Sequence, residues 1–260
     1  MKLMNYRYLL SALLLTLCFS VSNKTFCQGS LFSRQTYKNA AGDSLQYRFL
    51  FPDNDSTRRY PLVIFLHGSG ERGNDNEAQL KWGVINFATD YNMKTHPAFV
   101  IAPQCPLNST WANITRGKNN EIILQNTPSK PMQVLMELIG DVIRRFRVDT
   151  NRIYITGLSM GGHGTFDALQ RYPHFFTAAV PVCGSGDISK AVSIAHIPLW
   201  MFGGADDPSV NPNLLYNMVN ALLKAGAHPG FTEYPGVGHF SWIAAYSDPM
   251  MMEWLFNQHK

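Results

Sequence analysis

Residues 152–166, RIYITGLSMGGHGTF, constrain the fold more than any other part of the chain. They run from an apolar stretch typical of a buried strand into a glycine-rich stretch typical of the start of a helix. At the junction stands Gly157-Leu158-Ser159-Met160-Gly161, a G-x-S-x-G pattern. A sharp strand-to-helix turn brings together the positions two residues before and after its centre, where side chains would collide. The pattern therefore predicts that Ser159 projects its hydroxyl above the end of a strand.

Apolar runs alternate with amphipathic patterns over most of the chain. The expected strands are residues 31–37, 44–51, 62–66, 99–102, 152–156, 178–182, 199–202 and 231–234, and the expected helices are residues 132–146, 162–171, 213–224 and 242–258. The first two strands are joined by a turn-rich hairpin loop, and the later alternation implies βαβ units with right-handed crossovers. We predict an α/β fold with a mainly parallel central sheet and helices on both faces. Residues 105–130 form a long polar connection, a kind of loop that tends to be functional.

The first 28 residues have the features of a secretory signal peptide. Lys2 and Arg7 precede an apolar run at residues 8–21, which is shorter than the ~18–20 residues of a membrane span. We expect residues 1–28 to be removed on export to a secreted or periplasmic location, and residues 29–260 to form a single domain. An uncleaved anchor is the alternative, but we expect no integral membrane association.

The charge balance changes when this segment is set aside. It holds three of the 22 Lys and Arg residues and no acid, which leaves 19 basic against 18 acidic residues. A nearly neutral chain without a basic stripe gives no reason to expect nucleic acid as a partner. Apolar residues at 45% and charged residues at 15% are ordinary for a globular protein with a full core.

A serine hydroxyl is a weak nucleophile unless a base accepts its proton. Among the eight histidines, His239 lies just past the last expected strand and before the last expected helix. The carboxylate that orients such a histidine is expected after the strand at 199–202. We favour Asp207 there, because Pro208 holds its predecessor extended, with Asp206 as a near alternative and Asp187 as a distant one. No histidines have metal-ligand spacing, so we predict no catalytic metal.

The order Ser159, Asp207, His239 along the chain is that of α/β-hydrolases. With the segments FLHGSGERGND, FVIAPQCP, GLSMGGHGTF and YPGVGHFSW, residues 45–258 resemble the α/β-hydrolase fold. More narrowly, they resemble secreted bacterial esterases of carbohydrate esterase family one, which includes feruloyl and acetylxylan esterases and polyhydroxybutyrate depolymerases. The resemblance implies an α/β-hydrolase catalytic domain at residues 29–260 that needs no cofactor.

Residues 68–73, GSGERG, could form either of two kinds of loop, one that binds a dinucleotide or one that binds an oxyanion. They match the dinucleotide fingerprint G-x-G-x-x-G, which requires a helix directly after the third glycine and an acid about 20 positions further on. The polar residues 74–76 follow instead, so we expect no dinucleotide cofactor. The resemblance implies that the backbone N–H groups of Ser69 and Met160 bind a developing oxyanion.

The resemblance implies a secreted serine carboxylic-ester hydrolase that acts through an acyl-enzyme. Its substrate would be a feruloyl or acetyl ester on plant polysaccharide or its oligosaccharides. Trp111 and Trp242 are candidate substrate-binding walls, although Trp242 could equally pack the last helix. One alternative is a serine peptidase of the prolyl-oligopeptidase-like type, although the large N-terminal domain of such enzymes is not expected here. Another is a non-catalytic binding relative, which would usually lack a triad member.

The two cysteines outside the predicted signal peptide, Cys105 and Cys183, follow strands that the usual order of this fold puts three steps apart. Three steps of ~4.8 Å span about 14 Å. A disulfide needs Cα atoms within ~7 Å, so we expect two buried thiols.

Overall fold

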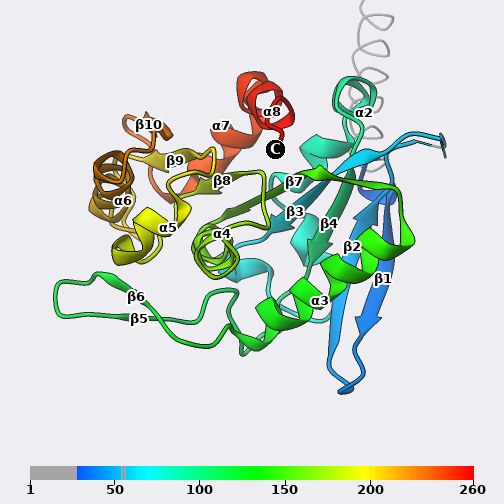
Figure 1. Cartoon of the computed structure of the whole chain (residues 1–260), viewed down its shortest axis with the longest axis horizontal. Helices are drawn as coiled ribbons and strands as arrows, with labels where there is room; N and C mark the ends of the chain where they lie inside the picture. Colours follow the sequence, from blue (N-terminus) through cyan, green and yellow to red (C-terminus); the bar gives the residue numbers. More distant parts are fainter. Residues whose placement is uncertain (1–27, 54, 56) are drawn as a thin grey trace, which may run out of the picture.

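The computed structural model describes residues 28–53, 55 and 57–260, so that nearly all of the predicted signal peptide lies outside the described residues. Its centre is an eight-stranded sheet of order β1-β2-β4-β3-β7-β8-β9-β10 (Figure 1). The strands are β1 (Phe32–Lys38), β2 (Ser44–Leu50), β3 (Tyr60–Leu66), β4 (Phe99–Pro103), β7 (Val148–Leu158), β8 (Ala178–Val182), β9 (Trp200–Gly204) and β10 (Gly230–Tyr234).

The sheet is mainly parallel. β2 pairs in antiparallel fashion with β1 and β4, whereas β4, β3, β7, β8, β9 and β10 pair in parallel with one another. Every expected strand is present, and β8 has the predicted bounds. Parallel strands direct their carboxyl ends to one edge of the sheet, which gathers the loops that follow β3, β7, β9 and β10.

Helices cover both faces of the sheet, as predicted. α3 (Lys130–Arg145), α4 (Met160–Arg171), α5 (Ala191–Ile194) and α6 (Asn213–Lys224) bury apolar side chains on one face. The short helical turns η2 (Ala78–Leu80) and η3 (Val84–Ala88), with α7 (Trp242–Ser247) and α8 (Pro249–Phe256), cover the other. β3 serves both layers, because its side chains alternate: Ile64 joins the first and Phe65 the second.

The last expected helix, residues 242–258, is wrong as a single element. A 3-10 turn, η5 (His239–Ser241), leads into α7, and α7 ends at Ser247. Asp248 is extended and caps α8 by accepting the N–H of Met250 at 2.8 Å, and Pro249 opens that helix. Proline cannot continue α7, but it suits the first turn of a new helix.

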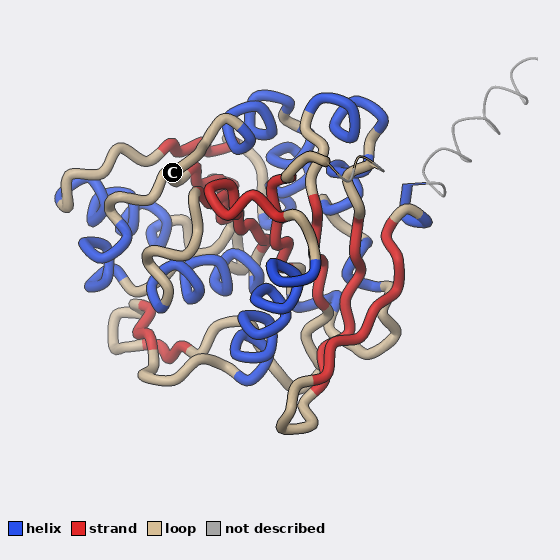
Figure 2. The backbone as a smooth tube through the Cα atoms, turned by 45° about the vertical axis from the view of Figure 1, so that its right-hand side comes forward, coloured by secondary structure: helices blue, strands red, loops and turns tan. Residues whose placement is uncertain are grey.

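The polar connection at residues 105–130 contains a hairpin that its composition did not reveal. β5 (Ile114–Arg116) pairs with β6 (Ile122–Leu124) in a separate two-stranded sheet. Figures 1 and 2 show this hairpin beyond α4, apart from the main sheet. A short α2 (Asp90–Thr95) between η3 and β4 was also not predicted.

Both described cysteines are free and buried, as predicted. Cys105 follows β4 and Cys183 follows β8, three strand steps apart in the sheet. Within the described residues, no helix combines the length and the apolar character needed to cross a membrane.

The turn from β7 into α4 explains the glycines around Ser159. A Cβ on Gly161 would lie 1.9 Å from the carbonyl oxygen of Leu66, and one on Gly157 would lie 2.5 Å from the carbonyl oxygen of Gly161. Backbone therefore packs directly on backbone at this turn, and β3 presses against the start of α4.

Replacing Gly161 with alanine should destabilise the fold by about 3 kcal/mol or more, because backbone cannot move aside as a flexible side chain can. The matched control is Gly140→Ala inside α3, where the added Cβ would lie 3.6 Å from its nearest neighbour, Arg144 Nη1. That change should stabilise by roughly 0.5–1 kcal/mol. Urea unfolding measures both, and equal effects of the two variants would contradict the packing argument.

Candidate active site

Three of the predicted residues meet at the carboxyl edge of the sheet. Ser159 follows β7, Asp207 follows β9, and His239 follows β10. His239 Nε2 lies 2.8 Å from Ser159 Oγ, and His239 Nδ1 lies 2.7 Å from Asp207 Oδ2. This is a continuous hydrogen-bond chain from a carboxylate through an imidazole to a hydroxyl, the arrangement that activates a serine as a nucleophile.

The loop after β9 distinguishes among the three candidate acids. Asp207 is buried, and its second oxygen, Oδ1, accepts the N–H groups of Ser209 and Val210 at 2.8 and 2.9 Å. Asp206 is exposed. Asp187 instead caps the turn that follows it and accepts the N–H of Leu124. The carboxylate beside His239 is therefore that of Asp207.

Ser159 has a backbone conformation that few residues other than glycine adopt, with φ 54° and ψ −114°. Its N–H donates to the carbonyl of Val182 at 3.0 Å, which ties the turn to the end of β8. Such strained conformations cost of order 1–3 kcal/mol and persist only where surrounding structure holds them. Here β3, β8 and α4 hold the serine above the sheet.

The loop after β3 lies against this turn. Gly68 is so close that a Cβ on it would be 2.8 Å from Leu158 Cδ1. Ser69 opens the short η1 (Ser69–Glu71), and Met160 opens α4. The first N–H groups of a helical turn have no partner within it. The two amides predicted to bind an oxyanion therefore both stand at helical starts beside Ser159.

His67 holds the direction of the Ser69 amide. Its Nε2 accepts the N–H of Cys105 at 2.9 Å, so that its proton is on Nδ1, which donates to the carbonyl of Gly68 at 2.6 Å. In a trans peptide the carbonyl and the following N–H point in opposite directions. The Ser69 N–H therefore points away from the His67 ring.

The prediction that Trp111 forms a substrate-binding wall is wrong. Its side chain has no exposed surface, because it packs against the His67 ring and against Gly164 of α4. Its indole N–H donates to the carbonyl of His67 at 3.2 Å. Trp242 is only 5% exposed, and its ring meets the His239 ring edge-on with centroids 5.2 Å apart. It lies beside the site mainly as packing.

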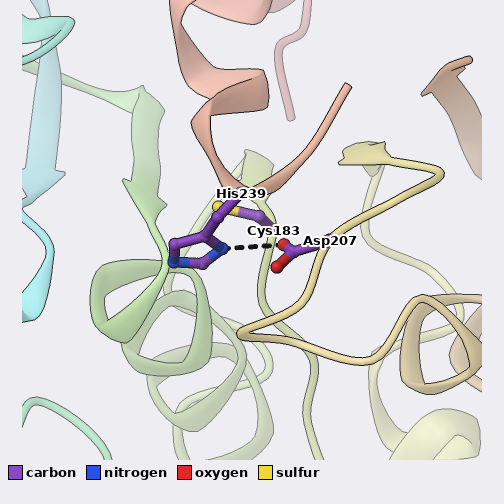
Figure 3. Close-up of side chains that lie close together, drawn as sticks. All are labelled: Cys183, Asp207 and His239. Carbon is purple, nitrogen blue, oxygen red and sulfur yellow. Dashed lines mark hydrogen bonds and ion pairs between the residues drawn. The ribbon is translucent and has the colours of Figure 1, made fainter. Parts of the chain in front are cut away.

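Cys183 joins the Asp207–His239 pair, as Figure 3 shows. Its Sγ and one ligand atom of each partner lie within 4.8 Å of one another. A metal ion would need a thiolate, and burial raises the pKa of this thiol to about 12. It would also compete for His239 Nδ1 and Asp207 Oδ2, which already bond each other. The donor set suits the hydrogen-bonded pair better than a metal.

Two residues near the site were missed from the sequence. Glu71, in η1, is buried, and burial raises the pKa of its carboxyl against the opposing effects of the Lys81 charge and of hydrogen bonds from Gly68 and the Trp82 side chain. Trp82 is half-buried, and its ring meets the ring of Trp242 with centroids 6.1 Å apart. Glu71 and Trp82 belong to no periodic or motif pattern in the sequence, so only their place in the structure shows that they lie near the site.

The phospholipase/carboxylesterase family model matches residues 53–250, most of the chain and all three members of the hydrogen-bond chain. The chain belongs to this family. The family match agrees with the α/β-hydrolase fold, and the expected resemblance to esterases of this fold is confirmed.

This member of the phospholipase/carboxylesterase family is also similar to individual known proteins. A bifunctional acetylxylan esterase/xylanase from Neocallimastix patriciarum is 23% identical over 72% of this chain, which spans 24% of that protein. The crystal structure of a thermostable esterase is 39% identical with a TM-score of 0.83, over 89% of this chain and 64% of the other. An acylaminoacyl peptidase from Pyrococcus horikoshii, 14% identical with a TM-score of 0.63 over 88% of this chain and 42% of the other, shares the fold.

Two histidines, the buried His67 and the half-buried His163, make stability depend on pH. Burial lowers the pKa of His67 and of His163 to about 4, against about 6.5 in an unfolded chain. Below pH 6.5 the unfolded state therefore binds more protons, and stability decreases as pH falls toward 4, by on the order of 3 kcal/mol for each histidine. Urea unfolding between pH 7.5 and 5 should show this decrease. His67→Gln should remove about half of this decrease, because His163 still contributes, and an unchanged slope would contradict the assignment.

Proposed function

We propose that the chain is an exported serine carboxylic-ester hydrolase that removes acetyl or feruloyl groups from plant polysaccharide or its oligosaccharides. In this proposal residues 1–28 direct export, and residues 29–260 are the catalytic domain. The observation that carries it is the hydrogen-bond chain from Asp207 through His239 to Ser159 Oγ. No cofactor is needed for this chemistry.

The reaction runs in two halves. Ser159 Oγ attacks the ester carbonyl carbon while His239 Nε2 takes its proton, and a bond from oxygen to carbon forms. The bond to the leaving oxygen then breaks, and His239 gives that oxygen the proton. Water repeats the sequence on the acyl-enzyme, releasing the carboxylic acid and restoring the serine hydroxyl. Asp207 stabilises the imidazolium in both halves.

Negative charge develops on the carbonyl oxygen in each half. We assign its stabilisation to the amides of Ser69 and Met160, each at the start of a helical turn. Each such donor is typically worth about 10²–10³ in kcat. The direction that His67 gives to the Gly68–Ser69 peptide makes the first donor ready before substrate arrives.

A peptidase is the second candidate, because a serine activated by a histidine and an aspartate can also attack amides, and because the acylaminoacyl peptidase shares the fold. Likeness at 14% identity supports the fold alone, whereas the family match and the acetylxylan esterase relative favour esters. A binding-only role is disfavoured, because binding alone does not require a serine in a strained conformation that is hydrogen-bonded to a histidine.

Asp207→Asn should lower kcat roughly 10⁴-fold, because an amide donating to His239 Nδ1 holds the ring in the wrong tautomer. The neighbouring Asp206→Asn is the matched control and should retain activity, since its side chain is exposed. Steady-state kinetics on a soluble ester separates them. A comparable loss in Asp206→Asn would contradict the assignment.

The substrate is tested by incubating the protein with natively acetylated and feruloylated arabinoxylan and quantifying the acids released. Release of acetate or ferulate above a Ser159→Ala blank is the expected result, because that variant lacks the nucleophile. Ser69→Ala should largely retain activity, since the Ser69 contribution comes from its backbone. If neither acid exceeds the blank, the polysaccharide proposal fails, and equal losses in the two variants would overturn the oxyanion assignment.

A further inference from the structure

Aromatic side chains beside His239 form a partly open surface. The rings of Trp82 and Phe240 lie 6.0 Å apart between centroids, and Trp242 contacts both, at 6.1 and 4.8 Å. Trp242 is buried and also touches the His239 ring. We call Trp82 and Phe240, resting on Trp242, the aromatic platform.

The exposure of the platform is not explained by packing. Phe240 is 57% exposed although it directly follows His239, and Trp82 is only half-buried. Exposed apolar surface at the mouth of a site, next to polar groups, is typical of ligand binding. Lys81 adds a polar group, since its Nζ lies 5.1 Å from the centre of a Trp82 ring.

The platform is held rigidly with respect to the nucleophile. Gly83, next to Trp82, has φ +74°, and a Cβ on it would lie 2.5 Å from the Tyr246 ring of α7. Asn86 donates to the carbonyl of Tyr246 at 2.9 Å. The Tyr246 hydroxyl in turn bonds Thr156 Oγ1 at 2.8 Å, in the strand that leads to Ser159. A preformed surface of this kind binds without a large ordering cost.

The proposed reaction says which part of a substrate meets this surface. His239 must give its proton to the leaving oxygen, so the leaving alcohol lies on the histidine side of Ser159. Phe240 is the next residue in the chain, and Trp82 lies beyond it. The carbonyl oxygen is turned instead toward the oxyanion amides of Ser69 and Met160. The surface beside His239 is therefore offered to the alcohol.

We propose that the aromatic platform binds the sugar ring of the leaving alcohol. The apolar CH face of the sugar stacks on Trp82 and Phe240, and the Lys81 ammonium donates to a sugar hydroxyl. This inference rests on the proposed function and deepens it, because it names the alcohol rather than the acid as the group that the platform selects.

The test compares two esters with the same acyl group. Acetylated xylo-oligosaccharide is paired with ethyl acetate, and feruloylated arabinoxylo-oligosaccharide with ethyl ferulate. Trp82→Ala and Phe240→Ala should each raise KM for the sugar ester roughly 3- to 10-fold and leave kcat within twofold, the size of one lost ring contact. Kinetics on the ethyl ester should not change. Trp82→Phe should recover most of the loss, and Tyr91→Ala, at an exposed aromatic on α2, is the control.

Equal losses on both esters of a pair would overturn the proposal, because the platform would then serve the acyl group or His239 itself. No loss on either ester would overturn it as well. Binding of unesterified xylo-oligosaccharide to Ser159→Ala, measured by calorimetry, separates this proposal from the proposed function. Binding that weakens in Ser159→Ala/Trp82→Ala supports the platform even if the wild type cleaves neither ester, in which case only the proposed function fails.

Discussion

Direct contact of backbone on backbone at the end of β7 is the constraint on which the rest of the site depends. Gly161 lies against the carbonyl of Leu66 in β3, and a Cβ on Gly162 would lie 2.5 Å from the carbonyl of Val182 in β8. No side chain fits at either position, so three segments far apart in sequence meet at one point. Ser159 keeps its strained conformation because these neighbours leave it no other. The positions of the histidine and the acid then follow from adjacent strands of the same sheet.

Much of the fold could be predicted because burial repeats with a regular period. β8 and α6 have the expected bounds, since an unbroken apolar run and an amphipathic face each leave a clear pattern. The missed elements are too short to show such a pattern, since α2 has 6 residues and β5 and β6 have 3 each. The break before Pro249 did carry a signal, because an aspartate followed by proline is a common start for a helix.

At the site, residue types were easier to predict than exposure. Ser159, Asp207 and His239 stand at strand ends within recognisable segments, and the structure brings them within hydrogen-bond distance. The candidate substrate-binding residues Trp111 and Trp242 could not be assigned in the same way, because a tryptophan in a loop is equally suited to a buried or an open position. Trp111 is fully buried against His67 and α4, whereas Trp82, which no motif singled out, is half-buried.

The β5–β6 hairpin is joined to the domain differently from every strand of the main sheet. The buried Asp167 of α4 accepts the N–H of Asn113 ahead of the hairpin, and its ion-pair partner Arg171 donates to the carbonyls of Gln125 and Asn126 behind it. Both ends are thus clamped by one helix, while the tip contributes little to the central core. Loops held in this way tolerate changes in length far better than core elements. Evolution could therefore lengthen, shorten or replace this hairpin without disturbing the hydrogen-bond chain of Ser159, His239 and Asp207.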